Sequence, residues 1–145
     1  MKKSNYFKLT VPSKSVNEGF SRAVVSAFSA LADPTVEILS DIKTAVSEAV
    51  TNCIVHAYKE QSGEITIDAA LFDNGTVKIR IRDKGCGIED VSRAMEPLYT
   101  TSGDERSGLG FSVMESFSDG LKVRSVPGKG TTVTITKFLT GKDEE

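Results

Sequence analysis

Two alternating segments joined by Asn74-Gly75 predict a β-hairpin in the middle of the chain. Successive side chains of a strand point to opposite faces, so this hairpin has one apolar face and one polar face. Asn-Gly is typical of tight hairpin turns. An apolar face needs a second layer to cover it, and the chain is therefore expected to fold as a sheet with helices on one side. The apolar positions are Ile65, Ile67, Ala69 and Leu71 before the turn and Val77, Ile79 and Ile81 after it.

Two segments before the hairpin have apolar residues at helical spacing. Ser15 and Glu18 match a capping box, which predicts a first helix ending near Ala32. Asp33-Pro34 resembles a cap followed by proline in the first turn, and this second helix is expected to reach about Tyr58. The apolar residues are Val16, Phe20, Val24, Ala27 and Leu31 in the first helix and Leu39, Ile42, Val46, Ala49, Cys53 and Ala57 in the second.

The other elements complete an α+β pattern. We expect a single domain, residues 1–145, with a mixed, mostly antiparallel β-sheet covered on one face by α-helices. A polar, glycine-rich segment is expected to form a surface loop between two of the helices. The expected elements are a strand at Phe7–Val11, a short helix at Glu89–Met95, the loop at Thr100–Gly108, a helix from Gly108 to Asp119-Gly120, and strands at Leu121–Val126 and Thr132–Phe138.

Composition excludes several classes of protein. The formal charge of −2, from 18 basic and 20 acidic residues, gives no general attraction to nucleic acid or to an anionic membrane. Neither a bilayer-spanning run nor a signal peptide is recognisable, so a cytoplasmic location is expected. Cys53, Cys86 and the single histidine, His56, make neither a disulfide framework nor a zinc site, and both thiols are expected to be reduced.

Asp83 is the first candidate site residue, because it occupies the apolar face of the second hairpin strand. A carboxylate there loses hydration, which is costly unless a donor meets it, and the sequence offers no obvious adjacent partner. An amine-bearing ring such as adenine would donate to it, and Gly85 and Gly87 would leave space for the ring. The alternative is that the strand simply ends here and the carboxylate meets solvent.

Glu48 and Asn52 form a second candidate site, since residues four apart share a helix face. An amide oxygen beside a carboxylate suits a magnesium-phosphate site: Asn52 would hold Mg²⁺ and Glu48 would orient or deprotonate a nucleophile. His56 continues the line and is expected to be structural or close to phosphate. The alternative is a solvated polar face.

A third candidate lies before the fourth expected helix. Gly108 and Gly110 leave backbone N–H groups at a helix start, where an anion such as phosphate binds, and Arg106 is near enough to assist. A glycine hinge of a lid is the alternative. Gly130 and Thr131, which open the last strand, indicate only a turn when taken alone.

Together these pieces resemble the GHKL, or Bergerat, family of ATP-binding folds, which includes gyrase-type ATPases and histidine kinases. The shared pattern is E-x-x-x-N on a helix, D-x-G-x-G after a strand, a polar lid, G-x-G before a helix, and G-T-T in the last strand. The resemblance implies ATP/ADP and Mg²⁺ as cofactors. By this resemblance Asp83 would accept the adenine amino group with support from Thr131, and Gly85 and Gly87 would leave room for the ring. Asn52 would bind Mg²⁺, Glu48 would be the catalytic base, and Gly108 and Gly110 would contact the phosphates.

Within that family the chain is similar to the anti-sigma-factor serine kinases, and its local sequence is close to that of the anti-sigma-F branch of endospore-forming bacteria. The segments that carry this are "DIKTAVSEAVTN", "PLYTT", "ERSGLGFSVMESF" and "GKGTTV". The resemblance implies a homodimer that sequesters sigma factor F and phosphorylates a serine of an anti-anti-sigma protein. It also implies partner contacts at Glu18 and Arg22, for which an exposed ion pair is the alternative.

Other interpretations stay open beside this one. Ser102 stands where the family carries a lysine after the two lid threonines, so Arg106 is the candidate cation for the γ-phosphate. An anti-sigma-B kinase would share the motifs. A sequestering module whose nucleotide only sets its shape is a third interpretation, and a histidine-kinase fragment is disfavoured.

Overall fold

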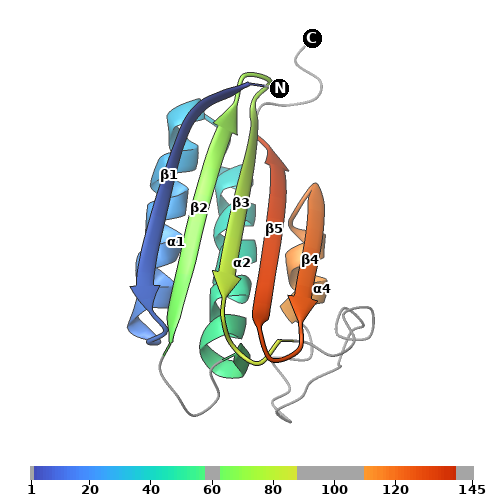
Figure 1. The fold of residues 1–145 in the computed structure, drawn as a ribbon. Helices are drawn as coiled ribbons and strands as arrows, with labels where there is room; N and C mark the ends of the chain where they lie inside the picture. Colours follow the sequence, from blue (N-terminus) through green and yellow to red (C-terminus); the bar gives the residue numbers. More distant parts are fainter. Residues whose placement is uncertain (1, 58–62, 88–109, 140–145) are drawn as a thin grey trace.

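The computed structural model describes residues 2–57, 63–87 and 110–139, and these ranges form two layers (Figure 1). One layer is a five-stranded sheet in the order β1-β2-β3-β5-β4, in which every neighbouring pair is antiparallel. The other consists of helices, all on the same face of the sheet. The expected α+β fold, with helices on one face, is therefore confirmed.

The expected strands are all present, each a little longer than its apolar pattern. In the central hairpin, Ile67 lies opposite Ile81 and Ile65 lies opposite Asp83. Gly75 adopts a positive φ of 84° in the turn, as the Asn-Gly pair predicted. The strands are β1 (Lys3–Pro12), β2 (Glu64–Phe72), β3 (Thr76–Asp83), β4 (Gly120–Val126) and β5 (Gly130–Phe138).

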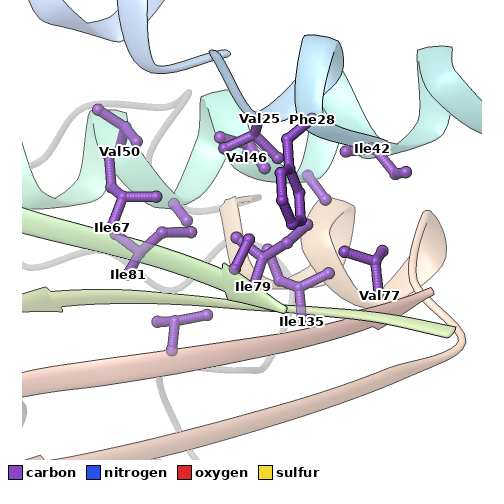
Figure 2. Close-up of a cluster of buried hydrophobic side chains, with 14 of the residues drawn as sticks. Val25, Phe28, Ile42, Val46, Val50, Ile67, Val77, Ile79, Ile81 and Ile135 are labelled. Carbon is purple, nitrogen blue, oxygen red and sulfur yellow. The ribbon is translucent and has the colours of Figure 1, made fainter. Parts of the chain in front are cut away.

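The two faces of the sheet differ as the alternation predicted. On the outer face, Asp68 binds two arginines of the neighbouring strand, with Arg80 Nε at 3.0 Å and Arg82 Nη2 at 3.3 Å. The inner face packs against the helices and forms the core (Figure 2). Its fully buried side chains include Ile65, Ile67, Val77, Ile79, Ile81 and Ile135 from the sheet and Val25, Ile42, Val46 and Val50 from the helices.

Helix α1 (Val16–Ser29) continues as a 3₁₀ turn, η1 (Ala30–Ala32), so the expected end near Ala32 is confirmed. The expected capping box is wrong. Ser15 has helical dihedral angles, φ −59° and ψ −29°, and its side chain makes no capping hydrogen bond. A hydroxyl caps the first turn from an extended backbone, so this conformation of Ser15 removes the cap. Glu18 instead pairs with Arg22 one turn later.

The side of α1 that packs on the sheet is not the one with the most apolar residues. Ser21, Val25, Phe28 and Ser29 are buried there. Val16, Phe20 and Leu31, which share helical spacing, are 74%, 51% and 67% exposed. The core side of α1 includes two serines, whereas Val16 and Phe20 of α1 and Leu31 of η1 face outward.

Helix α2 (Val36–Asn52) is capped by Thr35, whose side-chain oxygen accepts a 3.1 Å hydrogen bond from the Ile38 N–H. The expected start at Asp33-Pro34 is therefore wrong by two residues. Asp33 is left-handed, with φ 57°, and ends the preceding turn. A π-helical segment, η2 (Cys53–Ala57), extends α2, and α4 (Gly110–Ser116) follows later in the chain.

Some expectations fall outside the described residues, namely the short helix at 89–95, the polar loop at 100–108 and the end of the second helix at Tyr58. Among the helices that are described, none has both the length and the apolarity needed to cross a bilayer. The apolar stripe of α2 is confirmed at Ile42, Val46, Ala49 and Cys53, all of which are buried.

Candidate functional site

The candidate site lies at one end of the two layers. There β3 and β4 end, β5 begins, and α2 passes into η2 (Figure 1). The end of α2, the end of β3 and the turn between β4 and β5 are far apart in sequence, and the fold brings them together. The motifs around Asn52, Asp83, Gly110 and Thr131 therefore belong to the same end of the molecule.

Asp83 is the last residue of β3 and points inward, as the alternation predicted. Its Oδ1 accepts backbone N–H bonds from Gly85 at 2.9 Å and from Thr131 at 3.3 Å. Its Oδ2 accepts a bond from the Cys53 thiol, at 3.4 Å from Sγ. The carboxylate is therefore held from β5, from its own loop and from the helix layer.

Burial and hydrogen bonding act in opposite directions on this carboxyl. Loss of hydration raises the pKa of Asp83 above its ordinary value, and it outweighs the bonds from Gly85, Cys53 and Thr131, which lower it. Burial also raises the pKa of the Cys53 thiol well above its usual range, and the negative charge of Asp83 adds to that effect. Cys53 is therefore a protonated donor at neutral pH.

Cys53 is the residue of this site that sequence reasoning missed. Its spacing in α2 placed it with the core residues, and it is only 4% exposed. The last inward position of β3 meets Cys53, the residue directly after α2, which is how Asp83 acquires a thiol as neighbour. The sequence pattern gave no signal for this contact, since the expected apolar stripe continues past Cys53 to Ala57. The two cysteines form no disulfide, as expected, with Cys53 buried and Cys86 exposed.

The expected support of Asp83 by Thr131 uses the backbone of that residue. The Thr131 side chain lies on the same face of the sheet as Asp83, and its Oγ1 is 2.8 Å from Ser125 Oγ of β4. Gly130, just before it, has φ +130°, and a Cβ there would collide with the backbone of Asp83 and Lys84. The glycine of "GKGTTV" thus permits β5 to begin directly against the end of β3.

Gly87 also has a structural reason to be glycine. Its φ is +77°, and a Cβ would collide with the carbonyl of Val126 and lie 2.9 Å from Pro127 Cα. The loop after Asp83 is further tied to the β4–β5 turn by a 2.7 Å bond from Gly128 N–H to the Cys86 carbonyl. This loop is therefore fixed against the neighbouring turn beside the Asp83 carboxylate.

Asn52 and Gly110 lie next to each other, although 57 intervening residues separate them in the sequence. A Cβ at Gly110 would lie 3.1 Å from Asn52 Oδ1 and 3.2 Å from Nδ2. A side chain at position 110 would require the amide of Asn52 to shift by a few tenths of an ångström. The oxygen that could hold a cation and the helix start that could face phosphate are therefore neighbours.

Glu48 lies one turn before Asn52 in α2. Asn52 faces Gly110 of α4, whereas Glu48 faces α1. It lines an open groove of about 700 Å³ between α1 and α2, together with Arg22 and Lys43. Arg22 forms the expected pair with Glu18, at 3.5 Å between Nη1 and Oε2. The candidate base and a candidate partner contact thus share one groove.

Three expected contributors lie outside what the structure describes: Arg106, Gly108 and the side chain of His56. Within the described ranges, no group of three or more His, Cys, Asp or Glu side chains could hold a metal ion. The donor set that fits Mg²⁺ is the Asn52 amide oxygen in contact with Gly110, which suits an ion that also takes phosphate oxygens and water.

Sequence comparison defines the class to which this fold and site belong. Residues 14–137 match the model of the histidine kinase-like ATPase domain, so the chain belongs to that family of nucleotide-binding domains.

Within this class, the similar proteins are anti-sigma F factors, and the chain belongs to the anti-sigma F factor family. The protein from Caldanaerobacter subterraneus subsp. tengcongensis is 55% identical over 140 residues, covering 96% of this chain and 97% of that protein. The one from Thermoanaerobacter sp. is 52% identical, covering 99% and 100%. The one from Clostridium acetobutylicum is 49% identical, covering 92% and 93%.

Solved structures agree with the fold at low sequence identity. A Mycobacterium tuberculosis protein with RsbU and RsbW domains aligns with 94% of this chain and 33% of its own, with a TM-score of 0.70 and 22% identity. The histidine kinase domain of an Erythrobacter litoralis blue-light activated kinase aligns with 84% of this chain and 61% of its own, with a TM-score of 0.57 and 20% identity. At these identities the likeness concerns the fold alone.

Proposed function

We propose that this protein is an anti-sigma factor that sequesters sigma factor F and uses Mg-ATP to phosphorylate a serine of its anti-anti-sigma antagonist. The observation that carries the proposal is the meeting of the motifs at one end of the fold, with Asp83 buried as an acceptor and Asn52 against Gly110. These positions match an adenine site and a phosphate site. The names of the anti-sigma F factor relatives support sigma factor F as a partner.

Each residue has a role in this proposal. Asp83 accepts the adenine amino group beside the Gly85 to Gly87 loop, while Thr131 holds the carboxylate through its N–H. Asn52 holds Mg²⁺, and Gly110 at the start of α4 faces the phosphates, with Gly108 and Arg106 as further contacts. Mg²⁺, when bound, neutralises charge on the phosphate oxygens.

Transfer of the phosphoryl group is assigned to the C-terminal end of α2, where Glu48 lies one turn before Asn52. The serine oxygen forms a bond to the γ-phosphorus of ATP, the bond from that phosphorus to the bridging oxygen breaks, and ADP is the leaving group. Glu48 orients the serine hydroxyl and accepts its proton. Glu48 also lines the groove between α1 and α2 with Arg22, so a partner bound in that groove would bring its serine near Glu48.

The outward side of α1 is the proposed surface for the sigma factor and its competitor. Val16 and Phe20 of α1 and Leu31 of η1 expose apolar side chains there. The Glu18–Arg22 pair lies about half a turn round α1 from Val16 and Phe20, and Arg22 lines the groove toward α2, so the proposed contact area extends over both sides of the helix. Exposed apolar side chains are typical of protein-binding surfaces. A homodimer completes the proposal, and sedimentation of the purified chain would test it.

The deciding experiment is transfer of label from γ-labelled Mg-ATP to the antagonist, comparing wild type with Glu48→Gln, which keeps the size of the side chain and removes its charge. We expect label on a partner serine, about 100-fold less of it in the variant, and unchanged ADP affinity. Equal loss of transfer and ADP binding would contradict the role of Glu48. Sigma binding with ATP bound and no transfer by the wild type would favour the sequestering module.

A further inference from the structure

We propose that Cys53 is a positioning residue for base recognition: its thiol holds the Asp83 carboxylate in the orientation that accepts the amino group of an adenine nucleotide. This inference rests on the proposed nucleotide-binding function. It adds a residue that none of the site motifs contains. The contact that carries it is the 3.4 Å bond from Cys53 Sγ to Asp83 Oδ2.

The acceptor positions of Asp83 indicate which oxygen meets the base. A carboxylate oxygen has two lone-pair positions. Oδ1 accepts two backbone N–H bonds, from Gly85 and Thr131, so both of its positions are filled. Oδ2 accepts only the thiol among the described residues, which leaves one position. The amino group of the base and the Cys53 thiol therefore share Oδ2.

The position of Cys53 suits this task. The backbone donors hold Asp83 from its own loop and from β5, whereas Cys53 approaches from the helix layer at the end of α2. Bonds from two sides prevent rotation of the carboxylate about its terminal torsion, which is otherwise broad. With 4% exposure, Cys53 cannot be replaced in this role by bulk water.

The alternative is a purely structural role, in which Cys53 only fills space in the core, since a buried thiol behaves as a small apolar group. The two interpretations differ in one measurable respect. A space-filling side chain affects every ligand of the pocket alike. A side chain that orients Asp83 affects only ligands that offer an amino group to it.

The test compares ADP with inosine diphosphate, which has a carbonyl oxygen where adenine has the amino group. Cys53→Ala and Cys53→Ser have similar side-chain volumes and differ in a hydroxyl donor, so they form a matched pair. We expect Cys53→Ala to weaken ADP binding about three- to tenfold, since bonds to a charged acceptor carry energies of that order and a thiol is a weak donor. Inosine diphosphate binding should change less than about twofold, and Cys53→Ser should recover part of the ADP affinity.

Titration calorimetry gives the affinities, and urea unfolding shows whether each variant is folded. Should Cys53→Ala fail to fold, Cys53→Val supplies a second side chain without a donor. Equal weakening of both nucleotides, or equal ADP affinities for the Ser and Ala variants, would overturn the inference. Wild type that binds neither nucleotide would contradict the proposed function itself. If wild type binds ADP, Asp83→Asn does not, and Cys53→Ala binds both nucleotides as wild type does, only the inference fails.

Discussion

Asp83 keeps three hydrogen-bond donors around a carboxylate that burial disfavours as an anion. A purely structural position would be served as well by a neutral acceptor, because an amide oxygen also accepts bonds from backbone N–H groups. The charged form suits a ligand that donates, since bonds to an ionised acceptor are stronger than neutral ones. In the proposed function, the residue thus trades some stability of the nucleotide-free protein for nucleotide binding.

This trade predicts a pH dependence of stability. The pKa of Asp83 is raised by folding, so the folded state binds the proton more tightly than the unfolded state does. Its contribution is fully present below the unfolded pKa of about 3.9 and is lost as pH rises through the raised folded pKa. Urea unfolding of wild type and Asp83→Asn from acid to neutral pH measures it.

The wild-type free energy of unfolding, minus that of Asp83→Asn, should fall as pH rises above about 4. The variant removes the contributions of all other carboxyl groups from the comparison, because both proteins contain them. A difference that increases with pH would mean that folding stabilises the Asp83 anion, contrary to the burial argument.

Among the elements, the starts of α1 and α2 form a natural comparison. Thr35 caps α2 through its side chain, whereas Ser15 precedes α1 without a capping bond. Thr35→Ala should therefore lower the free energy of unfolding by about 1 kcal/mol, the usual value of such a cap. Ser15→Ala is the matched control, and urea unfolding at pH 7 measures both.

We expect Ser15→Ala to change stability by less than about 0.5 kcal/mol, which is typical of surface substitutions. A loss for Ser15→Ala as large as that for Thr35→Ala would show that Ser15 caps α1 in solution.

At the scale of helices and strands, the sequence predicts the strands better than it predicts where the helices begin and end. The period-2 pattern of β2 and β3 fixes both the strand and its inner face, because a shift by one residue would bury Lys78 and Arg80. The predicted helix caps at Ser15 and Asp33-Pro34 were wrong because a residue caps a helix only in a particular backbone conformation, and the sequence does not determine that conformation. The core side of α1 was hidden because it includes Ser21 and Ser29, while Phe20 and Leu31 face outward.

At the scale of the whole molecule, Lys137 connects three elements. Its ammonium group, on β5, lies 3.1 Å from Asp41 Oδ2 of α2 and 3.1 Å from the carbonyl oxygen of Phe117, which follows α4. Lys137 is only 8% exposed, so its charge depends on these partners. Removing the carboxylate leaves a buried cation with one neutral acceptor among the described residues.

We therefore expect Asp41→Ala to lower the free energy of unfolding by about 1–3 kcal/mol, somewhat less than for a fully buried pair because Asp41 is partly exposed. In a Lys137→Met background the same change should have little effect, since no buried charge remains. A double-mutant cycle by urea unfolding measures the coupling. Equal effects of Asp41→Ala in both backgrounds would contradict it.

Part of the candidate site could be predicted from the sequence, because some of its residues lie in short motifs. Asp83, Gly110 and Asn52 lie in motifs whose local geometry is encoded nearby. The contact between Cys53 and Asp83 depends instead on where α2 ends relative to β3, which only the packing of the two layers determines.

The strand order has a consequence for synthesis of the chain. Strand β1 pairs with β2, and the two are separated in sequence by α1 and α2. While Phe72, the last residue of β2, is still inside the ribosome, β1 has no neighbouring strand, and α1 and α2 have no sheet to cover. Ile42 and Val46 then remain open to water. Co-translational folding of this protein thus waits for its central hairpin, and the emerging first half is the stage at which a chaperone would find most to bind.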